Sequence, residues 1–303
     1  MHKGLKSVGK TRIKGQLAGF CFVLPAVLVV GLLLLYPVCT SLFYSFTSKH
    51  LIKQSFKMVW FDNYVAILKD PVFWRSFLTN IVWTVTSLVG QLLVGFFAAL
   101  ALERIEYAKG FFRTVLIIPW AFPSIVIALS WKWILNGVNG FVPNILLKLG
   151  ICETVPQFLT STTLVFPTMV FINIWFGAPL IMVNVLSALQ TVPRDQYEAA
   201  EIDGASSFQS FVHITIPHIK VVMGLLMVLR TIWIFNSFDM IYLITGGGPG
   251  GLTQTVPIYA YNVGWGLKML GRSSAVTVIL LIFLLTVCMM YFRLLDRWEK
   301  EGA

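Results

Sequence analysis

Acidic side chains are concentrated in one short stretch of an otherwise apolar chain. Asp195, Glu198 and Glu201 follow Pro193 at close intervals. A proline at the first helical position and carboxylates near the positive end of a helix both favour a short helix here. The spacing therefore predicts a short helix that carries three carboxylates.

A second short helix is predicted directly after this one. Gly204 interrupts the first helix, and Pro217 marks the start of the next long apolar segment. Between them, apolar positions at i, i+3, i+4 and i+7 form one helical stripe: Phe208, Phe211, Val212 and Thr215. Two small helices bent at a glycine predict a knob that fits a groove on a soluble partner.

Other chemistry is poorly supported by the residue pattern. The acids gather in this loop together with His213 and His218, so no acid pair or His/Asp constellation is left for an enzyme at a membrane interface. No metal-ligand spacing is present. Gly246 to Gly251 lacks the Gly-Lys-Ser/Thr that a phosphate-binding loop requires. We expect no catalytic residue, no metal and no nucleic-acid partner.

The composition identifies the solvent of this chain as largely lipid. Hydrophobic residues make up 57% of the 303 residues and charged residues only 12%, whereas soluble domains carry about 25% charged residues. One helical crossing needs about 20 apolar residues. We therefore expect an all-α integral membrane fold with six transmembrane helices, near residues 16–37, 77–102, 112–135, 162–190, 218–244 and 273–294.

The distribution of Lys and Arg predicts the orientation. The basic N-terminal tail, 1–16, favours a cytoplasmic N-terminus, and six crossings then place the C-terminal tail, 296–303, on the same side. A single transmembrane domain, 17–295, lies between the tails. The lysine-rich segment 38–76 becomes an exception on the outer face, where its aromatic residues favour a surface position along the lipid. Its role stays open.

Prolines and cysteines give weaker indications. Pro119 and Pro123 lie within the third predicted span, where proline is expected to kink a helix, although proline is common in membrane helices. Cys39 and Cys152 both fall in outward-facing segments, so the sequence leaves a disulfide between them open. The outer segment 136–161 is expected to be loop with one short helix.

A charged side chain at mid-membrane costs at least about 2.5–3.5 kcal/mol on insertion scales, so each one is a functional candidate. Three such candidates occur: Lys132, Arg230 and Asp239. Lys132 stands between two tryptophans near the outer surface, which snorkelling explains. Arg230 and Asp239 are separated by half a helical revolution, so they cannot pair along one helix. We expect Arg230 to face water or another subunit. A ligand contact and a structural role are equally open for it.

The acidic segment and the residues that follow it resemble a motif of a known protein family. Glu198-Ala199-Ala200 with Asp203-Gly204-Ala205, followed by Ile214–Pro217, resembles the EAA loop of permease subunits of bacterial ABC importers. We call residues 191–217 the coupling loop. Val221 departs from the family pattern, which often has a second proline there. Further segments are similar to the maltose-transporter type of carbohydrate importer: Ile118–Pro123, Trp131–Trp133, Leu189–Pro193, Asn236–Asp239 and Thr245–Pro249.

The resemblance implies a type I ABC importer permease fold, in a bacterial cytoplasmic membrane, that works by alternating access. It implies three partners: a second homologous permease, a homodimeric or heterodimeric cytoplasmic ATPase, and an extracytoplasmic solute-binding protein. ATP and Mg²⁺ would be bound by the ATPase and no cofactor by this chain. The resemblance implies that six residues couple this subunit to the ATPase: Glu198, Ala199, Ala200, Asp203, Gly204 and Ala205.

The resemblance also implies a sugar-binding cavity between spans four and five. On span four its residues are Asn173, Phe176, Gly177 and Leu180, and on span five Arg230, Ile234 and Ser237. Hydrogen-bonding groups and flat aromatic rings suit a sugar or oligosaccharide. An acidic sugar or a glycerol-phosphate-type solute is the alternative cargo, because of Arg230. A lipid-linked sugar transferase or a passive pore is a competing function, and neither explains the coupling loop.

Overall fold

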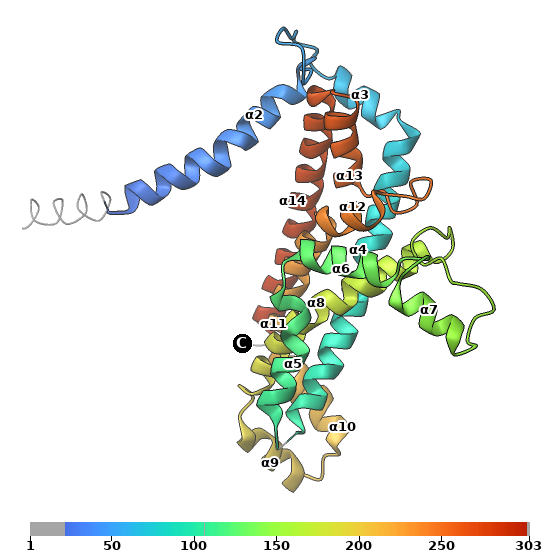
Figure 1. Cartoon of the computed structure of the whole chain (residues 1–303). Helices are drawn as coiled ribbons and strands as arrows, with labels where there is room; N and C mark the ends of the chain where they lie inside the picture. The colour runs from blue at the N-terminus through green and yellow to red at the C-terminus, as the bar shows by residue number, and fades with distance from the viewer. Residues whose placement is uncertain (1–21, 106, 302–303) are drawn as a thin grey trace, which may run out of the picture. The chain divides into compact units, whose positions relative to one another are not determined.

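The computed structural model describes residues 22–105 and 107–301, and within these ranges the chain is helical (Figure 1). The elements in chain order are η1 (Gly31–Leu35), α2 (Tyr36–Ser45), α3 (Asp62–Leu68), α4 (Pro71–Glu103), α5 (Lys109–Ala121), α6 (Ser124–Ile134), α7 (Phe141–Lys148), α8 (Val165–Leu189), α9 (Arg194–Ile202), α10 (Ser207–Ser210), η2 (Phe211–Thr215), α11 (Ile216–Phe235), α12 (Asp239–Thr245), α13 (Val256–Tyr261), η3 (Asn262–Gly266) and α14 (Leu270–Glu301).

Five described helices are long and apolar enough to cross a membrane, and a bent pair raises the number to six. This agrees with the six spans that the composition predicts. The chain divides into two compact units. One holds the described residues up to Ile67 with Val263–Val278, and the other holds Leu68–Asn262 with the chain from Ile279 onward.

In the first unit, the first span runs Phe22–Ser45 and is exposed over most of its length. The predicted end at Pro37 is wrong by eight residues. The π-helical turn η1 precedes Pro37, and a wider turn accommodates a residue that has no amide hydrogen. Asn63 then fixes the chain after this helix, because its Nδ2 donates to the carbonyls of Ser45 and Thr47 at 2.8 and 2.9 Å. The predicted start at 16 and the tail 1–16 lie outside the described residues.

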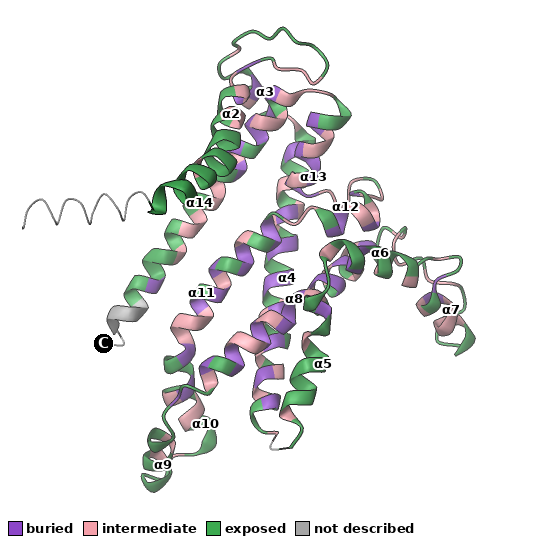
Figure 2. Cartoon of the chain, turned by 60° about the vertical axis from the view of Figure 1, so that its left-hand side comes forward, coloured by how far each residue is buried: buried purple, intermediate pink, exposed green. Residues whose placement is uncertain are grey.

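The second unit is built on α4, which packs most extensively on α8 and also contacts α11 (Figure 2). Glycines allow the close approach of α4 and α8. A Cβ at Gly95 would lie 2.7 Å from the Ala178 carbonyl oxygen and 2.8 Å from the Ile181 Cβ. Small residues at such crossings are typical of membrane helix pairs. The buried faces of α4, α8 and α11 therefore form the core of this unit.

The third predicted span, 112–135, is not one helix. It consists of α5 and α6, which meet at an angle of 90°. Phe122 and Pro123 at the junction adopt extended backbone ψ angles of 148° and 139°. Proline disfavours a helical conformation in the residue before it, so Pro123 explains the break. By contrast, Pro119 and Pro179 are accommodated inside α5 and α8.

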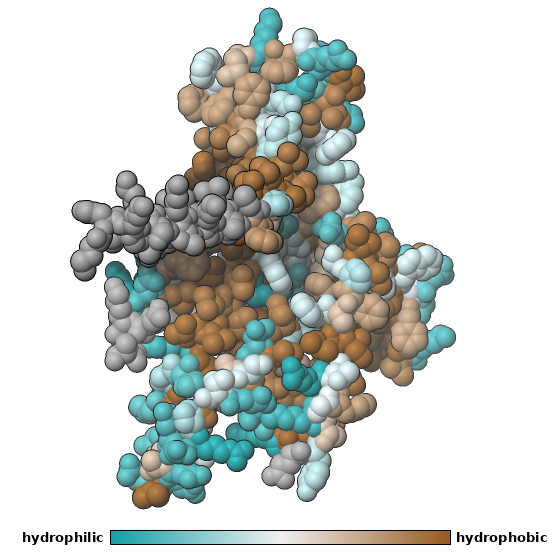
Figure 3. Space-filling model, turned by 90° about the vertical axis from the view of Figure 1, so that its left-hand side faces the viewer, coloured by the Kyte–Doolittle hydropathy of each residue, from teal (hydrophilic) through white to brown (hydrophobic). Residues whose placement is uncertain are grey.

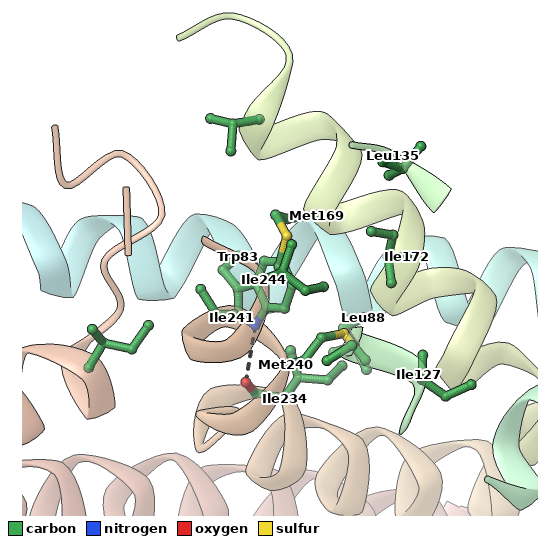
Figure 4. Close-up of a cluster of buried hydrophobic side chains, with 13 residues drawn as sticks. Trp83, Leu88, Ile127, Leu135, Met169, Ile172, Ile234, Met240, Ile241 and Ile244 are labelled. Atoms are coloured by element: carbon green, nitrogen blue, oxygen red, sulfur yellow. Dashed lines mark hydrogen bonds between the residues drawn. The ribbon is translucent and has the colours of Figure 1, made fainter. Parts of the chain in front are cut away.

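The fifth predicted span, 218–244, is likewise interrupted. α11 ends at Phe235, and α12 begins at Asp239. The break removes the regular helical donors from the last carbonyls of α11, and α4 supplies donors to two of them. Asn80 Nδ2 donates to the Phe235 oxygen at 3.3 Å. Trp83 Nε1 donates to the Ile234 oxygen at 3.2 Å (Figure 4), which also accepts from the Ser237 amide at 3.1 Å.

Apolar side chains close around this interruption. Trp83, Met169, Ile172, Met240 and Ile241 belong to one buried cluster, which joins α4, α8 and α12 (Figure 4). At the far end of α12, Lys132 Nζ of α6 donates to the Leu243 carbonyl oxygen at 2.8 Å. Lys132 therefore has a specific partner on α12, in addition to the snorkelling that its position predicts.

The remaining predictions meet mixed outcomes. The short helix expected within 136–161, around Asn144 to Leu149, is present as α7, which begins three residues earlier at Phe141 and ends at Lys148. The segment 38–76 contains the end of the first span, α3 and the start of α4. α14 continues to Glu301, so the predicted tail 296–303 is helical as far as the structure describes it. Cys39 and Cys152 are free thiols, so the disulfide that the sequence left open is absent.

Candidate functional site

A cavity of about 270 Å³ lies where α11 is interrupted. Residues of α8, of the end of α11, of the break and of the first turns of α6 and α12 surround it. The lining residues are Ser124, Asn173, Phe176, Arg230, Trp233, Ile234, Asn236, Ser237, Phe238, Asp239 and Met240. Helix interruptions expose backbone and polar side chains inside a membrane protein, and such sites bind solutes in many transporters.

Arg230 is the only positively charged side chain in this lining. It is 4% exposed. Its Nε donates to Gln91 Oε1 of α4 at 2.8 Å, and its Nη2 donates to the same oxygen. Its Cζ lies 5.5 Å from the centre of the Trp233 ring. The side chain points toward Gln91, which supplies a neutral acceptor, and it also borders the cavity. That Arg230 faces water or another subunit stays a prediction.

Gln91 connects both sides of the cavity. It is fully buried, and its Nε2 donates to the Asn173 backbone oxygen at 2.9 Å and to Asn173 Oδ1 at 2.6 Å. Asn173 Nδ2 in turn points to Met240 Sδ at 3.8 Å, a weak acceptor. The amide of Gln91 thus uses its oxygen for Arg230 and its nitrogen for Asn173. This fixes the orientation of both side chains.

The structure brings together five of the seven residues predicted for the cavity: Asn173, Phe176, Arg230, Ile234 and Ser237. Gly177 does not line the cavity, but it lies behind Arg230, where a Cβ would collide with Nη2 of Arg230 and with the amide of Gln91. Leu180 lies outside the lining, and its carbonyl oxygen accepts a bond from Asn184 Nδ2 at 2.8 Å.

Sequence reasoning missed Gln91, although a signal was present. Polar residues recur on α4 at intervals of four, four, three and four residues, and all are buried: Ser76, Asn80, Thr84, Ser87 and Gln91. A polar stripe on one face of a membrane helix indicates a face turned toward protein or a cavity. It also missed Ser124, which is brought to the cavity by the 90° bend before α6.

The coupling loop begins as predicted and then differs. α9 begins after Pro193, and Gly204 ends it with a φ of +76°, a conformation that residues with a Cβ rarely adopt. Ser206 and Gln209 form a capping box at the start of α10. From Ser207 the chain is helical without interruption into α11, through the π-helical turn η2. The separate second helix ending at Pro217 is therefore wrong.

The tip of the coupling loop is exposed. Glu198, Ala199, Asp203 and Gly204 are exposed, whereas Ala200 and Ala205 are half-buried. Two large apolar side chains nearby have no cover, since Ile202 is 86% and Phe208 73% exposed. A hollow of about 310 Å³ is lined by Ala200, Asp203, Gly204, Ala205, Gln209, Ser210, His213 and Ile214. Hydrophilic side chains gather around this end in Figure 3.

Side-chain hydrogen bonds connect the coupling loop to the base of α11. Thr191 Oγ1 lies 3.2 Å from His218 Nε2. The Tyr197 hydroxyl of α9 lies 2.7 Å from Thr215 Oγ1. α11 runs from there to Arg230 and the cavity without a break. A displacement of α9 is thus connected, through the Tyr197–Thr215 contact and the helix α11, to the lining of the cavity.

Comparison with known proteins agrees with this architecture. The chain is 30% identical over 292 residues to the trehalose/maltose transport system permease protein MalF of Thermococcus litoralis, covering 96% of this chain and 98% of that protein. It is 32% identical over 273 residues to the sulfoquinovosyl glycerol transport system permease protein SmoG of Agrobacterium fabrum, covering 89% and 88%.

A solved structure shares the fold. It is the crystal structure of a bacterial ABC transporter involved in the import of the acidic polysaccharide alginate, with a TM-score of 0.82 at 21% identity, covering 95% of this chain and 98% of the matched chain. The family model described as "binding-protein-dependent transport system inner membrane component" matches residues 91–300, which include the cavity and the coupling loop. The chain belongs to this family of inner-membrane transport permeases.

Proposed function

We propose that this permease subunit carries a sugar or an oligosaccharide through the cavity at the interrupted α11, as part of an ATP-driven importer that works by alternating access. The observation that carries the proposal is the lining itself. Amide, hydroxyl and guanidinium groups of Asn173, Ser237 and Arg230 border the same space as the rings of Phe176 and Trp233. Sugars require both hydrogen bonds and flat apolar contact.

The names of the relatives support this cargo class, since they refer to trehalose and maltose and to a sulfoquinovosyl glycerol. The second of these solutes is acidic, and Arg230 in the lining favours an acidic sugar or a glycerol-phosphate-type solute as the second candidate cargo. A lipid-linked sugar transferase fits less well. Asp239 is the single carboxylate of the described lining, so a pair of acids is lacking there.

In the same proposal the coupling loop docks on a cytoplasmic ATPase that binds ATP and Mg²⁺. Glu198 contacts a basic group of that partner, Gly204 provides the bend, and the half-buried Ala200 and Ala205 keep the adjoining hollow open. Both chain termini lie in the cytoplasm. A second permease subunit and an external solute-binding protein complete the assembly. The exposed Ile202 and Phe208 support a docking role, because burying large apolar side chains against a partner protein stabilises the complex.

The experiment that tests the proposed function is uptake of radiolabelled di- and oligosaccharides by cells that express the whole importer. Asn173→Ala and Ser237→Ala are expected to lower uptake, while the complex still assembles. Ser187→Ala is the matched control, because Ser187 is exposed on α8 and bonds only to the carbonyl of Val183. Unchanged uptake in both cavity variants contradicts the proposal.

A further inference from the structure

We propose that the cavity recognises a saccharide through an acidic group, and that Arg230 is the residue that binds this group. The inference rests on the proposed function and names the chemical class of the solute. It starts from the charge of Arg230. Within the described part of the chain, no carboxylate lies within 4.0 Å of its guanidinium nitrogens, and its hydrogen-bond partner is the neutral Gln91.

A buried cation without a counter-ion is costly. Removing an ionised group from water is expensive unless it is paired, and charged residues in a membrane span usually pair or line a pathway. Arg230 is 4% exposed and lines the cavity. Gln91 Oε1 accepts two of its five N–H groups, both at one edge of the guanidinium. The remaining donors are available to a ligand in the cavity.

The guanidinium is also held in place for such a ligand. Gln91 is buried and bonded on its other side to Asn173, so it cannot turn away without losing the contacts to α8. Gly177 leaves the space that the guanidinium occupies. An arginine fixed in this manner matches the two oxygens of a carboxylate, or those of a sulfonate or phosphate, through paired hydrogen bonds.

A second feature of the cavity also favours negative charge. Ser124, which lines the cavity, is the first residue of α6. The first described intrahelical bonds of α6 are donated by Val126 and Ile127 to the Pro123 carbonyl, so the preceding amides point out of the helix. The N-terminus of an eleven-residue helix carries a partial positive charge.

Asp239 also lines the cavity and opposes an anion close to it. Its carboxylate stands in the first turn of α12 and is exposed. A carboxylate is an acceptor for sugar hydroxyls. The cavity therefore has a cationic side at Arg230 for the acidic group and an acceptor side at Asp239 for hydroxyls. The Asp239 carboxylate lowers the preference for an acidic sugar, and Arg230 has to outweigh it.

The test uses isothermal titration calorimetry on the assembled importer in lipid nanodiscs, with methyl glucuronide and methyl glucoside as probes. The two probes differ only at C6, which is a carboxylate in the glucuronide and a hydroxymethyl group in the glucoside. We expect the glucuronide to bind about tenfold or more tightly than the glucoside. Arg230→Gln should bring the two affinities together. Asp239→Asn removes a negative charge from the same cavity, so it should increase the preference for the glucuronide over the glucoside.

Gln91→Glu is the second variant, in case Arg230→Gln does not assemble. The new carboxylate has nearly the shape of the amide and pairs with the guanidinium, so the preference for the glucuronide should be lost while Arg230 stays buried. Assembly is checked by size-exclusion chromatography.

Equal binding of the two probes by the unmodified importer, or no binding of either, overturns the inference. A ratio that Arg230→Gln leaves unchanged overturns it as well. These outcomes differ from a failure of the proposed function, which would appear as normal sugar uptake by Asn173→Ala and Ser237→Ala.

Discussion

Gly177 of α8 lies directly against the guanidinium of Arg230 on α11, and there is no room between them for a methyl group. We therefore expect Gly177→Ala to displace Arg230 from Gln91. Overpacking of this kind costs about 1–3 kcal/mol. Uptake by the importer should fall, and the thermal midpoint of the purified subunit should drop.

Gly31→Ala is the control for this substitution. Gly31 also lies in a membrane helix, but nothing comes within 4 Å of the position that its Cβ would take. This variant should behave as the unmodified protein. If Gly31→Ala lowered uptake and the thermal midpoint as much as Gly177→Ala, any glycine replacement in a span would be harmful. The contact between Gly177 and Arg230 would then not be the cause of the loss.

Trp83 provides a test of the interrupted α11. Trp83→Phe removes the Nε1 donor to the Ile234 carbonyl but keeps an aromatic ring in the buried cluster. The Ile234 oxygen keeps its backbone bond from the Ser237 amide at 3.1 Å, so loss of the Trp83 bond alone should destabilise the unit by about 1 kcal/mol. The measurement is thermal unfolding in detergent. Trp133→Phe makes the same chemical change at a side chain that is 73% exposed, and should have no effect. A similar loss in both would contradict the role of Trp83.

The coupling loop gives a prediction about energy transfer. Glu198→Lys and Gly204→Pro should uncouple ATP hydrolysis from transport while the subunit still inserts, because one reverses the docking charge and the other forbids the positive φ. The comparison is ATPase rate against uptake in proteoliposomes that hold the whole importer.

Two substitutions serve as controls for the coupling loop. Gln196→Lys adds a positive charge on a different face of α9, since Gln196 is two residues from Glu198. Gly204→Asn tolerates the left-handed backbone. Both should stay coupled. Normal transport by Glu198→Lys and Gly204→Pro would refute the docking role.

Tyr197 tests the connection from α9 to α11. Tyr197→Phe keeps the ring and removes the hydroxyl that contacts Thr215 at 2.7 Å. We expect fewer molecules transported per ATP hydrolysed, with the ATPase rate itself nearly unchanged. Tyr107→Phe, at a side chain that is 85% exposed, is the matched control. An unchanged transport ratio in Tyr197→Phe would mean that this hydroxyl carries no coupling.

The sequence predicted the membrane fold and the number of spans because hydropathy over about 20 residues is averaged over whole helices. The family resemblance implied most of the residues that line the cavity, and the helical spacing agrees with it, because Asn173 and Phe176 share one helical face and Arg230, Ile234 and Ser237 another. The prediction that Leu180 lines the cavity failed because the cavity forms only where α11 is interrupted. Side chains of α4 donate to carbonyls at that interruption, and the sequence pattern does not show these contacts.

The breaks themselves were harder to predict. Proline is frequent in membrane helices, and nothing local distinguishes Pro123, which ends a helix, from Pro179, which lies inside one. The environment of Arg230 was also beyond the sequence pattern, because Gln91 is 139 residues away along the chain. The polar stripe of α4 is visible in the sequence at regular helical spacing. A search for apolar runs does not detect it, because it scores only the hydropathy of the whole segment.

The most direct test of the account is the side of the membrane on which the coupling loop lies. A single cysteine at Phe208, in a chain whose four native cysteines are replaced, should react with a membrane-impermeant thiol reagent in inside-out vesicles and not in intact cells. A cysteine at Val138, which is 77% exposed in the outer segment, should show the reverse. Labelling at position 208 from the exterior alone would contradict docking on a cytoplasmic ATPase, and with it the proposed mechanism.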